Sequence, residues 1–337
     1  MSKFYNCSFL NSGLHFTPEH MRFCCATVFG PYVNIDKFDY DKVLSALFEK
    51  RNQLITDMHN HLIPKECETC IYLKELDSDD NKIPQEILSQ QKEIPKISSI
   101  IINHYKQCDC YCIYCSQFIY QKKITTVPIK SEFYDLLPII ERLYKQDMID
   151  KENLKVEFQG GSIGVLEEFP ELVKIFLDNN VKHISFFSNG IKYSPEIVET
   201  AKKAECMIIC SVDAGSPEVF KKLKSVDKYD QVISNLKRYK QEAPNSIINA
   251  KYILINDIND SIEEIEKYLV AVADAKVDMV QLDMDFKKVM CFKGVHYDVP
   301  EKHKEIFAYF EKRAKELGIR PFIWEYIQSV LDKGYFE

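Results

Sequence analysis

The 337-residue sequence lacks an apolar run that approaches the ~20 residues needed to cross a membrane. Its polar start, MSKFYNCSFLNSG, does not resemble a signal peptide, so we expect a soluble, cytoplasmic protein without a membrane partner. It also lacks a basic run: 44 Lys and Arg stand against 51 Asp and Glu, a net charge of -7. Because phosphate binding needs clustered Lys and Arg, we expect no nucleic-acid partner.

Cysteine, by contrast, is abundant, with 12 residues. A secreted disulfide scaffold would be short and rich in loops, which this chain is not. In a reducing cytosol, clustered cysteines more often bind metal than pair with one another. Most of these cysteines lie in the first 115 residues: Cys7, Cys24, Cys25, Cys67, Cys70, Cys108, Cys110, Cys112 and Cys115. The sequence therefore favours a metal-binding protein.

The hydrophobic pattern divides the chain into four parts. A Cys-rich segment covers 1–76 and contains one helix-like stretch near 40–59, and a polar linker covers 77–95. From 96 to 318, short apolar or β-branched runs alternate with segments of helical period. The tail, 319–337, reads as a packing helix. The predicted strands are 97–102, 156–158, 183–187, 207–212, 250–255 and 279–284.

Several local signals support the predicted helices. The run SEFYDLLPIIERLY (131–144) places its apolar residues on one face. Ser194-Pro195 is a helix start signal, and Ser261 with Glu264 has the spacing of a capping box.

Six strand–helix units predict a parallel sheet covered by helices. We expect an α/β fold, a partial (β/α)6 TIM-like barrel with a small Cys-rich N-terminal segment; a doubly wound sheet also fits. In either arrangement, ligands gather at the C-terminal ends of the strands.

Cys108, Cys112 and Cys115 follow the first predicted strand and form a C-x3-C-x2-C set, with Cys110 as an extra thiol inside it. Closely spaced thiolates suit iron–sulfur or zinc. A structural zinc site closes with four ligands. Three thiolates on a four-iron cluster instead leave one iron without a protein ligand.

This motif, with Tyr114 before its last cysteine, resembles the radical SAM superfamily. The resemblance implies an enzyme in which the open iron of a [4Fe-4S] cluster binds S-adenosylmethionine (SAM). Reductive cleavage of SAM then gives a 5′-deoxyadenosyl radical that abstracts a substrate hydrogen. It further implies a reducing partner such as flavodoxin or ferredoxin. The alternative is a zinc knuckle built from Cys108, Cys110, Cys112 and Cys115.

Residues after the next strands extend the resemblance. Gly160-Gly161-Ser162 stands where the family usually carries Gly-Gly-Glu, which assigns this turn to the SAM amino group and leaves the side chain of Ser162 without an assigned role. Ser188-Asn189-Gly190 is similar to Thr-Asn-Gly, and the run from Ser211 to Gly215 to Ser-Leu-Asp-Ala-Gly. Read alone, each is an ordinary cap or turn. The implied SAM-binding residues are Tyr114, Gly160, Gly161, Ser162, Ser188, Asn189, Ser211, Asp213 and Lys251.

The remaining N-terminal cysteines are similar to the auxiliary-cluster segment (SPASM/Twitch type) of many radical SAM enzymes. The resemblance implies a second [4Fe-4S] cluster on Cys7, Cys25 (with Cys24 as its alternative), Cys67 and Cys70. The position of this segment departs from the family pattern, because the auxiliary-cluster segment usually follows the barrel and here it precedes it. A four-Cys zinc site and unligated thiols are the alternatives.

The resemblance further implies that the substrate is a small sugar-like molecule or a peptide, and that the reaction is an oxidation, epimerisation or crosslinking. Asp283, at the end of the sixth predicted strand, is a candidate substrate contact. Cys291, in the loop beyond it, is a candidate hydrogen donor, a candidate cluster ligand or an ordinary structural thiol. Other function classes stay open: an iron–sulfur electron carrier without catalysis, or a zinc-stabilised binding protein.

Overall fold

The computed structural model describes residues 4–18, 20–23, 32–34, 39–68, 70, 72–76, 96–115, 134–285 and 296–335. Within them, all six predicted strands are present and lie side by side in one parallel sheet. A strand that is buried on both faces has a nearly continuous apolar sequence, which is why these strands could be recognised from sequence. Their bounds are β6 (Ser99–Ile102), β7 (Lys155–Phe158), β8 (His183–Ser188), β9 (Glu205–Ser211), β10 (Ile247–Leu254) and β11 (Met279–Met284).

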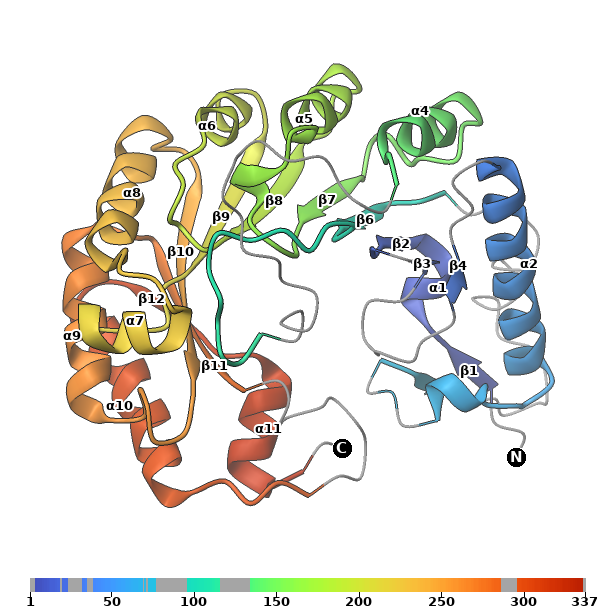
Figure 1. Cartoon of the computed structure of the whole chain (residues 1–337). Helices are drawn as coiled ribbons and strands as arrows, with labels where there is room; N and C mark the ends of the chain where they lie inside the picture. Colours follow the sequence, from blue (N-terminus) through green and yellow to red (C-terminus); the bar gives the residue numbers. More distant parts are fainter. Residues whose placement is uncertain are drawn as a thin grey trace.

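The sheet continues past these six strands on both sides. β2 (Gly13–Phe16) pairs parallel with β6, and β12 (Arg320–Phe322) pairs parallel with β11. Two antiparallel strands, β3 (His20–Arg22) and β4 (Tyr32–Asn34), follow β2 at the edge. The order is β12-β11-β10-β9-β8-β7-β6-β2-β3-β4, which curves without closing between the described edge strands (Figure 1). The expected partial barrel, with its α/β fold, is confirmed.

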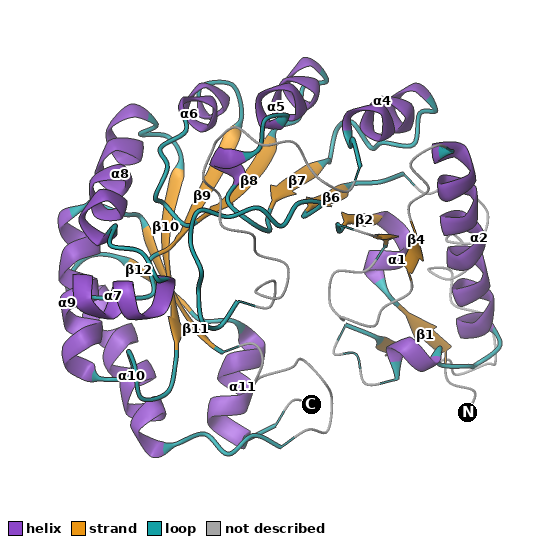
Figure 2. Ribbon diagram, in the orientation of Figure 1, coloured by secondary structure: helices purple, strands orange, loops and turns teal. Residues whose placement is uncertain are grey.

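Helices cover the outer face of the curved sheet, and the inner face is left to the loops (Figure 2). The helix that follows β7 illustrates the packing: Phe158 on the strand stacks on Phe186 and meets Phe169 edge-on, all three side chains being buried. The helices on the outer face are α4 (Leu137–Lys145), α5 (Phe169–Asp178), α6 (Pro195–Ala201), α8 (Tyr229–Glu242), α9 (Ile262–Asp274) and α10 (Glu301–Glu316). The helix α7 (Pro217–Lys224) follows β9, and α11 (Glu325–Lys333) follows β12.

The helix start signals are confirmed where the structure describes them. α6 begins after Ser194 with Pro195 in its first turn, and the Ser261 side chain accepts a hydrogen bond from the Glu264 N–H at the start of α9. α4 begins at Leu137, later than the predicted 131, because Pro138 fits only the first turn of a helix. Residues 131–133 lie outside the described part.

The N-terminal segment is divided between the sheet and a small unit beside it. α1 (Ser8–Ser12) leads directly into β2, and β2 pairs with β6. Strands from the predicted N-terminal segment and from the predicted barrel, which begins at 96, therefore share one sheet. α2 (Tyr40–His59) coincides with the helix-like stretch expected there. β1 (Phe4–Asn6) and β5 (Lys74–Leu76) form a separate antiparallel ribbon, with the 3-10 helix η1 (Lys65–Cys67) before β5. The linker 77–95 lies outside the described residues.

Among the described residues, the structure has no helix both long and apolar enough to cross a membrane.

Candidate functional site: the cysteine loop and its cavity

The cysteine loop, residues 103–115, leaves the C-terminal end of β6 and runs along the inner side of the barrel (Figure 1). Two backbone hydrogen bonds fasten it to the end of α7: the Tyr111 N–H donates to the Lys224 carbonyl at 2.9 Å, and the Ile113 N–H to the Leu223 carbonyl at 3.0 Å. A loop without helix or strand of its own must satisfy its backbone groups elsewhere. Here the last turn of a helix supplies the acceptors.

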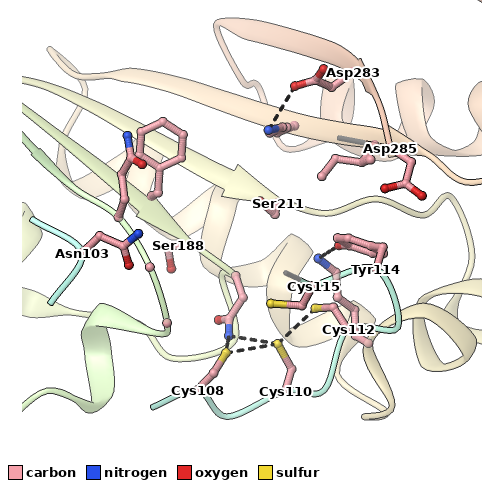
Figure 3. Close-up of a pocket in the computed structure, with 18 of the residues that line it drawn as sticks. Asn103, Cys108, Cys110, Cys112, Tyr114, Cys115, Ser188, Ser211, Asp283 and Asp285 are labelled. Atoms are coloured by element: carbon pink, nitrogen blue, oxygen red, sulfur yellow. Dashed lines mark hydrogen bonds and ion pairs between the residues drawn. The ribbon is translucent and has the colours of Figure 1, made fainter. Parts of the chain in front are cut away.

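The four thiols of this loop line one cavity of about 430 Å³ at the C-terminal ends of the strands (Figure 3). Cys108 and Cys110 have their sulfurs 3.5 Å apart, and Cys110 and Cys112 have theirs 3.6 Å apart. The Sγ atom of Cys110 therefore lies between two of the three motif cysteines. Cys108, Cys110 and Cys112 are buried, and Cys115 is half-buried.

Asn189, the first residue after β8, faces these sulfurs. Its side-chain amide lies 3.5 Å from the Cys110 sulfur and 3.7 Å from that of Cys108, and it donates to the Asp109 carboxylate at 2.5 Å. The sulfurs of Cys108 and Cys110 and a carboxylate oxygen of Asp109 come within 4.8 Å of one another, close enough to share a metal ion.

Two of the loop thiols, Cys110 and Cys112, hold their protons firmly while no metal competes for the sulfurs. Hydrogen bonding to Cys108, followed by burial, raises the pKa of Cys110 to about 12. Hydrogen bonding to Cys110 and burial raise the pKa of Cys112 well above its usual range. A bound metal reverses this balance, because a coordinating thiol loses its proton outright.

The glycine turn after β7 packs directly against the cysteine loop. Gly160 has φ +106°, and a Cβ there would lie 2.3 Å from the Asn103 side-chain oxygen. A Cβ on Gly161 would lie only 1.9 Å from the carbonyl oxygen of Gln107. Both glycines line the cavity, whereas Ser162 is buried behind it and donates its N–H to Gln107. Only glycine allows this approach of two backbones.

The other strand-end residues fall into two groups. Ser188, Asn189, Ser211 and Lys251 line the cavity, as does Tyr114. Asp213 does not: it is fully buried behind the lining, where its carboxylate pairs with the Lys224 ammonium group and accepts the Tyr114 hydroxyl at 2.5 Å. The sequence resemblance placed a ribose contact at Asp213, but these protein partners already occupy its carboxylate.

Lys224 was not found by sequence reasoning. Burial, the largest single influence, would lower its pKa, but the Asp213 carboxylate together with Cys112 and Cys110 outweighs burial and raises the pKa above the ordinary value. The lysine therefore keeps its charge inside the protein. Nothing in the run KKLK separates it from Lys221 and Lys222, because only the fold turns one of these side chains inward.

Acidic residues line the cavity across from the cysteines (Figure 3). Asp283, at the end of β11, forms an ion pair with Lys251 at 3.2 Å and accepts the Met284 N–H at 3.1 Å. Asp285 follows it on the same wall. The cavity thus has a sulfur-rich side and a charged side, joined by the glycine turn and the polar strand ends.

Comparisons with known proteins agree with this geometry. A sequence model of the radical SAM superfamily matches residues 102–269, which hold the cysteine motif and the strand-end residues through Lys251. The chain belongs to the radical SAM superfamily. This match confirms the family resemblance inferred from the cysteine motif. The cofactors of radical SAM proteins are a [4Fe-4S] cluster and SAM.

Individual radical SAM relatives are distant. The chain is 23% identical over 174 residues to GTP 3′,8-cyclase of Haemophilus influenzae strain PittEE, covering 51% of this chain and 49% of the relative. It thus spans about half the length of the curated relatives it matches. Streptococcus suis SuiB bound to S-adenosylmethionine superposes with a TM-score of 0.53 at 13% identity, over 90% of this chain and 70% of SuiB, which supports the fold alone.

The described N-terminal cysteines, Cys7, Cys67 and Cys70, lie on the small unit beside the barrel. Cys7 follows β1, and the Cys70 N–H donates to the Cys67 carbonyl at 3.0 Å in the turn before β5. Because Asn6 pairs with Lys74, Cys7 and this turn lie at the same end of the ribbon. Cys25, the predicted fourth ligand, and its alternative Cys24 lie outside the described residues, as does Cys291. The auxiliary cluster stays a prediction.

Proposed function

We propose that the chain is a radical SAM enzyme whose cluster ligands are Cys108, Cys112 and Cys115. One observation carries the proposal: the three thiols, the glycine turn and the polar strand ends share a single cavity. The donor set fits, because soft thiolates are the ligands that iron–sulfur clusters use. When bound, the cluster supplies the electron that cleaves SAM to methionine and the 5′-deoxyadenosyl radical.

The remaining cavity residues bind and orient SAM in this proposal. The backbone of Gly160 and Gly161 receives its amino group, while Ser188, Asn189 and Ser211 offer polar atoms to the ribose hydroxyls. Lys251 meets the SAM carboxylate and stays within reach of Asp283. Tyr114 closes the sulfur side, while Ser162 and Asp213 act from behind the lining by holding the loop and its neighbours.

Asp283 contacts the substrate from the opposite wall, with Asp285 beside it. Carboxylates there accept hydrogen bonds from hydroxyl or amino groups, which both a sugar-like molecule and a peptide carry. The relatives support both classes, since one is named for GTP and SuiB is also known bound to the precursor peptide SuiA. Cys291 is proposed as the hydrogen donor, and flavodoxin or ferredoxin as the source of electrons.

A second candidate follows from Cys110. Its sulfur lies between those of Cys108 and Cys112, and all four loop thiols line the cavity. Four thiolates complete a structural zinc site, and such a site would leave no position for SAM. Metal analysis therefore separates the two candidates.

The test is anaerobic reconstitution with iron and sulfide, followed by iron, zinc and 5′-deoxyadenosine assays. Replacing Cys108, Cys112 and Cys115 with Ala should remove about four irons and abolish 5′-deoxyadenosine formation. Cys110→Ala is the matched control and should keep both. Zinc in the wild type without SAM cleavage, or loss of the metal in Cys110→Ala, would reject the proposal in favour of the zinc site.

A further inference from the structure

The Lys224 ammonium group lies beside the cysteine loop with almost no solvent contact, the residue being 1% exposed. It pairs with the Asp213 carboxylate and donates to the Tyr114 hydroxyl at 2.7 Å. It lies 5.3 Å from the centre of the Tyr114 ring. A cation buried this deeply is expensive unless its partners are fixed in place.

The Asp213 partner is fixed from several directions. One carboxylate oxygen accepts the Ile253 N–H at 2.8 Å, while the other faces Lys224 and Tyr114. The Asp213 carbonyl accepts the Asn259 side-chain amide at 2.8 Å. Strand β10 therefore holds the carboxylate, and the loop after β10 holds the Asp213 backbone.

The backbone of α7 ties Lys224 to the cysteines. The Lys224 carbonyl accepts the Tyr111 N–H, and the next residue, Ser225, donates its hydroxyl to the Tyr111 carbonyl at 3.0 Å. Tyr111 lies between Cys110 and Cys112 in the chain. These hydrogen bonds connect the end of α7 to the cysteine loop. The distance between the Lys224 ammonium group and the thiols is therefore set by the backbone as well as by the lysine side chain.

In the ion pair between Lys224 and Asp213, the lysine is the partner that lines the cavity. Lys224 lines the cavity with Cys110 and Cys112, whereas Asp213 lies behind the lining. A cluster that gains an electron gains one negative charge, so a fixed cation nearby stabilises the reduced form more than the oxidised form. Net charge around the sulfurs is one of the factors that set the reduction potential of iron–sulfur proteins.

We propose that Lys224 is a positioning residue whose buried charge, balanced by Asp213, sets the reduction potential of the cluster on the cysteine loop. This inference rests on the proposed function, since it requires an iron–sulfur cluster at Cys108, Cys112 and Cys115. The step concerned is a one-electron reduction, in which an external reductant gives the electron and the cluster accepts it. Lys224 changes only how readily the cluster accepts that electron.

The experiment is a potentiometric titration with dithionite, followed by EPR, on the reconstituted full chain. Lys224→Met should lower the midpoint potential, because a positive charge is removed. Asp213→Asn should raise it, because the lysine is left without its counter-charge. Lys224→Arg keeps the charge and should stay near the wild type. Lys221→Met, an exposed lysine on the same helix, is the matched control and should not shift the potential.

Opposite signs for the two charge changes are the decisive result, because a packing defect would not reverse with the sign of the charge removed. Equal potentials in all variants, or shifts of the same sign, would overturn the inference. If Lys224→Met does not retain iron, the double variant Lys224→Met/Asp213→Asn is compared with Asp213→Asn alone. The double variant should have the lower potential, and equality would again overturn the inference. A wild type without iron would instead reject the proposed function.

Discussion

The two cysteine-bearing regions of this protein are held in different ways. The cysteine loop 103–115 has no helix or strand of its own, yet the end of α7, the glycine turn after β7 and the side chain of Asn189 all bind it. In the described residues around Cys7, Cys67 and Cys70 the regular structure consists of short elements: a ribbon of three-residue strands, a 3-10 helix and the five-residue helix α1 that follows Cys7.

The difference indicates where each region obtains its order. The cysteine loop is held by backbone hydrogen bonds to α7 and by close packing against the glycine turn, so groups outside the loop place its thiols. The ribbon has little regular structure of its own, and a metal bound there would contribute folding energy directly. This contrast predicts that metal removal affects the two regions unequally.

The largest expected effect concerns the second cluster. The variant lacking Cys108, Cys112 and Cys115 should still bind about four irons and give a four-iron EPR signal after reduction. It should lose both when Cys67 and Cys70 are also replaced by Ala. Limited proteolysis should then cut 1–76 faster than the barrel, because the ribbon loses its metal. If the first variant binds zinc alone, or no metal, the prediction of an auxiliary iron–sulfur cluster is wrong. The cysteine loop would then be the one iron–sulfur region of the two compared.

An intermediate effect is expected at the centre of the better-held region. Asp213→Ala leaves the Lys224 charge buried without its partner, which should lower the free energy of unfolding by about 3–5 kcal/mol. Urea denaturation measures this, and SAM affinity should fall only as a secondary consequence. Asp227→Ala removes an exposed partner of Lys221 and should change stability little. A large loss of SAM affinity with unchanged stability would return Asp213 to direct ligand contact.

The smallest effect is expected in the N-terminal region. The Arg51 side chain, from α2, is buried and donates to the carbonyl of Leu10 in α1 at 2.6 Å. Arg51→Met should lower the free energy of unfolding by about 1.5–3 kcal/mol, the usual contribution of a hydrogen bond to a charged group. The exposed neighbour Lys50→Met is the control. Hydrogen exchange should locate the loss in α1 and β2, and an equal loss across the barrel would show that the two regions unfold together.

The sequence predicted those features that are encoded locally. Six strands were recognised because a buried parallel strand is a continuous apolar run, and α2 because its apolar residues recur with helical period. Ser194-Pro195 and Ser261 were recognised because capping depends on residues within one turn. The family was recognised because the cysteine spacing and the glycine turn follow short, ordered patterns.

Tertiary structure overrode some of these local signals. Glu264 has the spacing of a capping-box residue, but its carboxylate accepts the N–H groups of Gly215 and Ser216 at the start of α7 instead. β2 (Gly-Leu-His-Phe) and β12 (Arg-Pro-Phe) were not predicted, because neither is a continuous apolar run like the similarly short β6, and they are strands through their pairing with β6 and β11. Neighbouring strands decide the conformation of such short segments.

The sequence by itself thus determined the six barrel strands, several helices and which thiols are candidates for binding a metal, because each depends on residues close together in the chain. Only the tertiary structure decided which charges become buried. It brought Lys224 inward to Asp213 and Tyr114, placed the Cys110 sulfur among the motif cysteines and kept Asp213 out of the cavity. Burial and pairing are set by residues distant in sequence, and no local pattern records them.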